Sequence, residues 1–87
     1  MKIRKAQLET LISMNRGYWN HDITGIGLID AKCKAMHLYA RKTFGEDFGM
    51  ELCALVSTII KGNGLKPEAT NEDIYKVLEV LGYEVTE

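Results

Sequence analysis

Apolar residues along this chain recur at intervals of three and four positions, the spacing of one face of an α-helix. Four such stretches predict four helices, over about residues 4–16, 27 or 28–44, 47–61 and 71–81. Each stretch is followed by glycine, which readily takes the left-handed conformation that ends a helix. These glycines are Gly17, Gly45, the Gly62-Asn63-Gly64 group and Gly82. The pattern therefore predicts an all-α fold, a compact bundle of about four helices.

The apolar faces of the predicted helices differ in width. The third helix has the broadest, formed by Phe48, Leu52, Leu55, Val56, Ile59 and Ile60, and is expected to be central. The first has a narrow stripe of Leu8, Leu11 and Ile12, which suits a peripheral helix. The second aligns Ile29, Cys33, Met36 and Ala40, and the fourth aligns Ile74, Val77, Leu78 and Leu81. Packing of the first two helices against the last two would bury these faces.

The segments outside the helices carry three further signals. Thr70 and Asp73 approximate a capping box at the start of the fourth helix. The connections over 17–26 and 62–69 are long for so small a domain, and such loops are often functional. Residues 83–85 alternate like a short strand, but no second strand is evident to pair with them. We therefore expect extended coil there.

Length and composition indicate one domain over residues 1–87, because the chain is too short to fill a second core. A domain of this size has marginal stability, so a partner or a second copy would help it. Cys33 and Cys53 lack metal-binding or disulfide-framework spacing, which favours reduced thiols in a cytosol. The longest apolar run, residues 52–56, is far below the roughly 18 residues that span a bilayer. We expect a cytoplasmic protein that is not exported.

The two halves of the chain carry opposite charge. Residues 1–43 contain eight Lys or Arg against three Asp or Glu, whereas residues 44–87 contain three against nine. The halves are therefore about +5 and −6 within a total of −1. Such segregation favours association through complementary patches, including head-to-tail or isologous contact between two copies.

The second predicted helix concentrates basic residues beside its apolar face. Lys34, His37 and Arg41, together with Asp30, fall within about 60° of one another on the helix. One interpretation is a ridge that binds phosphates or an acidic protein patch. The other is a solvated face with an Asp30–Lys34 pair, or attraction to the protein's own acidic helices. Nucleic acid is the weaker ligand, because the net charge is slightly negative and the isoelectric point is near 6.1.

Tyr18 and Trp19 lie in the first long connection, and Trp19 is the only tryptophan. Aromatic side chains lose little rotamer entropy on contact, so exposed ones are preferred anchors at protein interfaces. A loop tryptophan can equally fold inward and cap the core. The sequence leaves both interpretations open.

Chemistry beyond binding has little support. His21, Cys33, His37 and Cys53 can be assembled as zinc ligands on paper, but nothing in their spacing demands a metal. Neither histidine has a convincing orienting partner, and no nucleophile has an evident adjacent base. We therefore expect no cofactor, no metal and no enzymatic activity.

The resulting hypothesis is a small protein-interaction module, a regulator or inhibitor that docks onto a larger protein through Tyr18, Trp19, Lys34, His37 and Arg41. One alternative is binding of nucleic acid or a small phosphorylated ligand by the basic face of the second helix. A further alternative is a structural subunit of a larger assembly.

Overall fold

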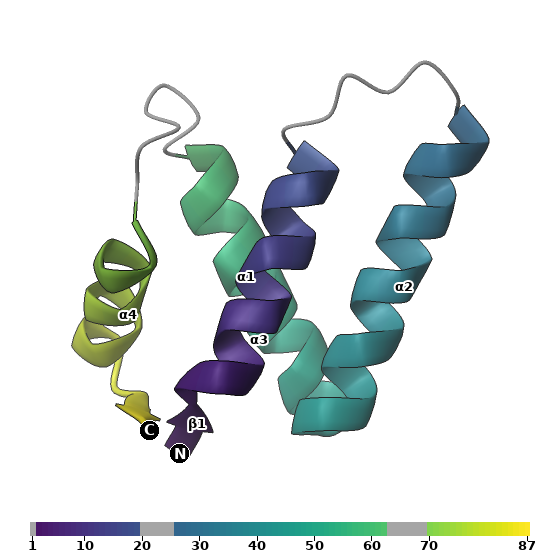
Figure 1. The fold of residues 1–87 in the computed structure, drawn as a ribbon. Helices are drawn as coiled ribbons and strands as arrows, with labels where there is room; N and C mark the ends of the chain where they lie inside the picture. The colour runs from purple at the N-terminus through teal and green to yellow at the C-terminus, as the bar shows by residue number, and fades with distance from the viewer. Residues whose placement is uncertain (1, 20–25, 63–69) are drawn as a thin grey trace.

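Helices make up most of the chain in the computed structural model, which describes residues 2–19, 26–62 and 70–87 (Figure 1). In chain order the elements are β1 (Lys2–Arg4), α1 (Lys5–Trp19), α2 (Ile26–Phe44), α3 (Glu46–Gly62), α4 (Asn71–Val80) and β2 (Glu84–Thr86). The described residues thus form four helices and one small two-stranded sheet. The predicted all-α fold class is confirmed.

Glycine ends two of the helices in the way the sequence predicts. Gly45, at φ +101°, separates α2 from α3, and Gly82, at φ +102°, follows α4. Beyond α4, the Gly82 amide donates to the Glu79 carbonyl and the Tyr83 amide donates to the Leu78 carbonyl, both at 3.0 Å. These paired bonds form a Schellman motif, which satisfies carbonyls that the last turn leaves open.

The start of α4 carries the predicted capping box. The Asp73 amide donates to the Thr70 hydroxyl at 3.2 Å, and the Thr70 amide donates to the Asp73 carboxylate at 3.0 Å. Hydrogen bonding of the Asp73 carboxylate with the Thr70 backbone amide, and with the Thr70 side chain, lowers the pKa of Asp73 below its ordinary value. A short helix at the margin of the fold therefore has a well-defined start.

Gly17 does not end the first helix, so this prediction is wrong. α1 runs on through Trp19, and the described glycines with positive φ do not include Gly17. Its carbonyl accepts a hydrogen bond from Lys32 Nζ at 3.5 Å, and the Trp19 indole bonds to Ser57 on α3. These tertiary contacts offset the roughly 1 kcal/mol by which glycine disfavours a helix relative to alanine.

The C-terminal segment is also not the expected coil. β2 pairs in parallel with β1, with Lys2 opposite Glu84, Ile3 opposite Val85 and Arg4 opposite Thr86. Ile3 is buried, and Lys5 Nζ lies 3.3 Å from a Glu87 carboxylate oxygen, so the two ends of the chain meet (Figure 1). The pairing was not evident from sequence because the helices together form the crossover between two three-residue strands.

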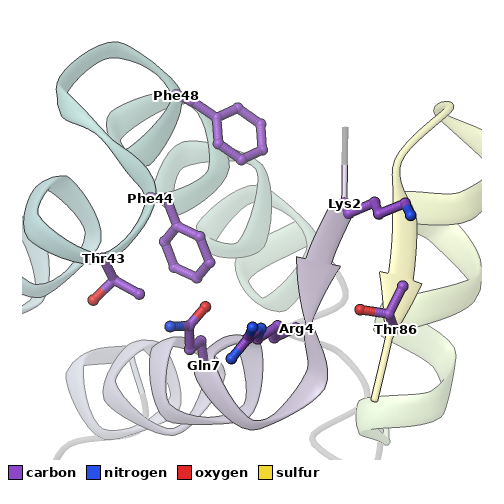
Figure 2. A pocket seen from close by; sticks show the side chains of 7 residues that line it. All are labelled: Lys2, Arg4, Gln7, Thr43, Phe44, Phe48 and Thr86. Atoms are coloured by element: carbon purple, nitrogen blue, oxygen red, sulfur yellow. The ribbon is translucent and has the colours of Figure 1, made fainter.

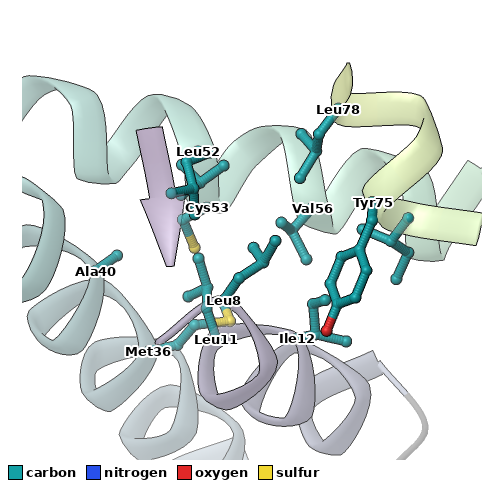
Figure 3. Packing of buried hydrophobic residues seen from close by; sticks show 12 residues of the cluster. Leu8, Leu11, Ile12, Met36, Ala40, Leu52, Cys53, Val56, Tyr75 and Leu78 are labelled. Atoms are coloured by element: carbon teal, nitrogen blue, oxygen red, sulfur yellow. The ribbon is translucent and has the colours of Figure 1, made fainter. Parts of the chain in front are cut away.

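The helices are not arranged as two pairs. α1, α2 and α3 contact one another, whereas α4 lies at one flank with α1 between it and α2 (Figure 1). All four helices send side chains into one core (Figure 3). The buried apolar residues are Ile3, Leu8, Leu11, Ile12, Met36, Ala40, Leu52, Cys53, Val56, Ile74, Tyr75 and Leu78.

The backbones of α2 and α3 touch at Gly49. A methyl group added there would lie 2.6 Å from the Ala40 carbonyl carbon and 2.9 Å from Arg41 Cα. Real side chains do not approach backbone atoms so closely, so glycine is required for this helix crossing.

The core face of α4 is narrower than the sequence predicts. Ile74 and Leu78 are buried as expected, but Val77 and Leu81 remain exposed and Tyr75 is buried instead. The reason is the position of α4 at the flank of the bundle, where only one side of the helix meets the core.

Candidate functional site

Tyr18 and Trp19 occupy the last turn of α1 rather than a loop. Their rings meet edge to face, with centroids 4.6 Å apart and planes at 86°. Tyr18 is half-buried and packs against the core, whereas Trp19 is 37% exposed. The two aromatics are therefore built into the helical scaffold.

Trp19 is held against α3 by a polar network. Its indole Nε1 donates to Ser57 Oγ at 3.2 Å, and that hydroxyl donates to the side-chain oxygen of Asn15. The Asn15 amide, which is fully buried, donates to the Leu11 carbonyl at 2.9 Å. Lys61 Nζ lies 4.9 Å from the centre of the Trp19 ring, within the range of a cation–π contact. Trp19 is thus partly exposed, and Ser57 connects its indole by hydrogen bonds to the buried side chain of Asn15.

The three predicted residues of α2 follow one side of that helix. Lys34 and Arg41 are exposed and His37 is half-buried, with its ring nitrogens 3.8 and 4.0 Å from Cys33 Sγ. Arg41 also lies 3.9 Å from Glu46 at the start of α3. Lys34 and Arg41 are seven residues, or roughly 10 Å, apart along the axis. These residues therefore form an elongated surface along α2.

The charge split of the sequence becomes a separation across the molecule. Residues 31–44 of α2 contain four Lys or Arg and no Asp or Glu, while α4 exposes Glu72, Asp73 and Glu79 against Lys76. The two helices lie on opposite flanks of the α1–α3 pair (Figure 1). The basic helix α2 is therefore separated from the acidic helix α4 by α1 and α3. Among the described residues, Arg41 of α2 lies within ion-pair distance of Glu46 on α3.

The cysteine and histidine side chains do not gather into a metal site within the described residues. No group of three or more His, Cys, Asp or Glu side chains there could hold a metal ion, and His21 lies outside the described residues. Cys33 is half-buried and Cys53 is buried. Burial raises the pKa of the Cys53 thiol, and a hydrogen bond with Asn15 only partly opposes this. Cys53 therefore stays a thiol near neutral pH.

The sequence did not predict the exposed apolar surface on α4. Val77, Val80 and Leu81 are 39%, 87% and 54% exposed and follow the i, i+3, i+4 spacing of one helix face. We call these three residues the α4 face. Its signal in the sequence was Val80, an apolar residue outside the predicted core stripe.

A pocket of about 480 Å³ opens beside the small sheet and was also missed (Figure 2). Its walls carry Lys2 and Arg4 from β1, and Phe44 and Phe48 from the corner between α2 and α3. Its polar lining is completed by Gln7, Thr43 and Thr86. No acidic residue lines it in the part of the chain that the structure describes. Basic and aromatic groups about 40 positions apart in sequence thus share one cavity.

Comparison with protein-family models, curated proteins and solved structures found no match to this chain. Among the helices that the structure describes, none is long and apolar enough to cross a membrane.

Proposed function

We propose that this chain is a small non-enzymatic protein-interaction module that regulates or inhibits a larger protein by docking onto it through the α4 face. The observation that carries the proposal is the exposure of Val77, Val80 and Leu81 on one side of a single helix. Burying a valine or leucine side chain contributes about 1.5–3 kcal/mol before the costs of association. Three such residues on one face can form the apolar centre of a docking site.

The charges on α4 indicate the kind of partner. The helix that carries the α4 face also exposes three acidic residues and one lysine. Complementarity therefore favours a partner protein whose contact surface has an apolar centre and a basic rim. The two free thiols suit a reducing compartment, so the proposal includes a cytoplasmic location.

A glutamate on the α4 face tests this proposal. Tagged wild-type chain and a Val80→Glu variant are used to isolate bound proteins from the native cell, and an identified partner is then purified and titrated directly. Because Val80 is almost fully exposed, the variant is expected to fold normally, which circular dichroism checks. We expect the purified partner to lose at least tenfold in affinity for Val80→Glu and to bind more weakly as salt is raised.

Leu38→Glu on α2 is the matched control, since Leu38 is 49% exposed on the opposite flank. The partner should bind this variant as it binds wild type. Unchanged binding to Val80→Glu contradicts the proposal, and loss with Trp19→Ala alone would assign docking to the end of α1. A further outcome is that the bound partner proves to be a second copy of this chain. If both Val80→Glu and Leu38→Glu then lose binding to it, the contact is head-to-tail between α4 and the basic surface of α2.

A second candidate function is binding of nucleic acid or a phosphorylated ligand along α2. Its support is the exposure of Lys34, Arg41 and Lys42 on a helix that lies on the opposite flank from acidic α4. Retention of an oligonucleotide at low salt, lost in a Lys34→Glu/Arg41→Glu variant, would favour it. No retention at low salt removes it and leaves the docking proposal, or a structural role in an assembly, as the account of this surface.

A further inference from the structure

The pocket beside the sheet has a preformed aromatic wall. Phe44 and Phe48 meet edge to face, with centroids 6.4 Å apart and planes at 82°. Tyr39 packs against Phe44 at 6.5 Å, and Tyr83 packs against Phe48 at 5.7 Å. The row of four rings therefore runs from α2 to the segment before β2.

The tyrosines at the two ends of this aromatic row are fixed by hydrogen bonds from their hydroxyl groups. Tyr39 donates to the Gln7 carbonyl at 3.4 Å, and Tyr83 donates to a Glu51 carboxylate oxygen at 2.8 Å. Neighbouring rings hold the two phenylalanines from either side. A wall fixed in this way loses little conformational entropy when a ligand packs on it.

The cationic side of the pocket follows from the strand geometry. Successive side chains of a strand point to opposite faces, so burial of Ile3 places Lys2 and Arg4 together on the outer face of β1. The parallel register sets Thr86 opposite Arg4. No described residue forms a hydrogen bond or ion pair with the Lys2 ammonium or the Arg4 guanidinium.

The remaining polar groups can support the same ligand. Figure 2 shows the Arg4 and Gln7 side chains next to each other, on the side of the pocket that faces the Phe44 ring. Gln7 offers amide donors, and Thr43 and Thr86 offer hydroxyl groups at the margins. A guanidinium group and an amide donor side by side are suited to a phosphate or carboxylate group.

We propose that this pocket binds a small organic anion, a phosphate or carboxylate attached to an aromatic or other flat apolar body. The anionic group lies against Arg4 and Gln7, and the apolar body packs on Phe44 and Phe48. The volume of about 480 Å³ is within the range typical of small-molecule sites. The site is separate from the α4 face, so it stands or fails independently of the docking proposal.

Phenyl phosphate is the probe that combines both features. We expect its titration into ¹⁵N-labelled protein to shift backbone amide resonances of residues 2–7, 43–48 and 84–86, with a dissociation constant on the order of 1 mM for a ligand of this size. Binding should weaken at least fivefold in Arg4→Gln, whose exposed side chain can be changed without disturbing the core. The matched control Lys76→Gln removes the same charge from α4 and should leave the dissociation constant unchanged.

Two further ligands separate the anionic from the aromatic contribution. Benzyl alcohol retains the ring without the charge, and inorganic phosphate retains the charge without the ring, so each should bind at least fivefold more weakly than phenyl phosphate. The assignment is overturned if the pocket resonances do not shift, if Arg4→Gln binds phenyl phosphate like wild type, or if either single-feature ligand binds equally well.

Discussion

Replacing Gly49 with alanine should destabilise the protein even though alanine is the better helix former. Propensity alone favours alanine by at most about 1 kcal/mol. The added methyl group, however, would lie 2.6 Å from the carbonyl carbon of Ala40 on α2. Carbon atoms pack best at about 3.5–4.0 Å, so the two backbones must separate by roughly 1 Å.

The cost of that separation is large because neither contacting group can rotate away. A gap of 0.5–1 Å forfeits about a quarter to a half of the dispersion energy of each contact, and overpacked cores typically lose about 1–3 kcal/mol. Because both contacting groups are backbone, we take the upper end of that range, about 3 kcal/mol. After subtracting the gain in propensity of about 1 kcal/mol, we expect Gly49→Ala to lower the free energy of unfolding by about 2 kcal/mol. The melting temperature should fall by roughly 8–16 °C for a domain of this size.

Gly17→Ala provides the matched control in another helix. Nothing lies within 4 Å of a methyl group added at Gly17, and its φ is not positive. Only the propensity effect remains, so this variant should be more stable than wild type by up to about 1 kcal/mol. Urea denaturation followed by circular dichroism at 222 nm measures both variants. A Gly49→Ala protein as stable as wild type would show that α2 and α3 do not touch there.

Three further predictions concern hydrogen bonds and thiols. Ser57→Ala leaves the buried amide oxygen of Asn15 without its donor and should lower the free energy of unfolding by about 1–3 kcal/mol in urea denaturation. In the native protein, a thiol reagent at pH 8 should modify half-buried Cys33 before buried Cys53, whose pKa burial raises, as mass spectrometry of the labelled peptides would report. Tyr83 donates to a carboxylate that raises its pKa, so folding retains the phenol proton and stability should decline above pH 10, less steeply in Tyr83→Phe.

Each of these predictions has an outcome that contradicts it. A Ser57→Ala variant with unchanged stability would mean that another group satisfies the amide. Equal labelling rates for Cys33 and Cys53 in the folded state would contradict the burial of Cys53. Identical stability profiles of wild type and Tyr83→Phe between pH 9 and 11 would exclude a contribution from the tyrosine hydrogen bond.

Local signals in the sequence predicted the helices well. The stops at Gly45 and Gly82 and the capping box of Thr70 and Asp73 depend on neighbours within six positions, so no distant contact was needed to find them. Gly17 is also a glycine that follows an apolar stretch, but it does not end its helix. Tertiary contacts of Trp19 and Lys32 extend α1 beyond it. Local preference of about 1 kcal/mol decides a boundary only where packing does not oppose it.

The candidate surfaces likewise have some features that the sequence predicts and others that depend on tertiary contacts. The sequence determined which residues are basic, acidic or aromatic, and their charge segregation appears intact as a basic α2 and an acidic α4. It could not show that Trp19 bonds to Ser57, or that Tyr18 and Trp19 lie in the last turn of α1. Those facts depend on how the helices cross.

The sequence by itself thus determined four amphipathic helices and their caps, because helical periodicity and capping act between residues a few positions apart. Tertiary structure alone decided three features: the parallel pairing of β1 with β2, the exposure of the α4 face, and the pocket that joins Arg4 to Phe44. Each depends on contacts between segments remote in sequence, and on which side of a flanking helix the core happens to cover. Periodicity identifies an apolar face, whereas packing determines how much of that face is buried.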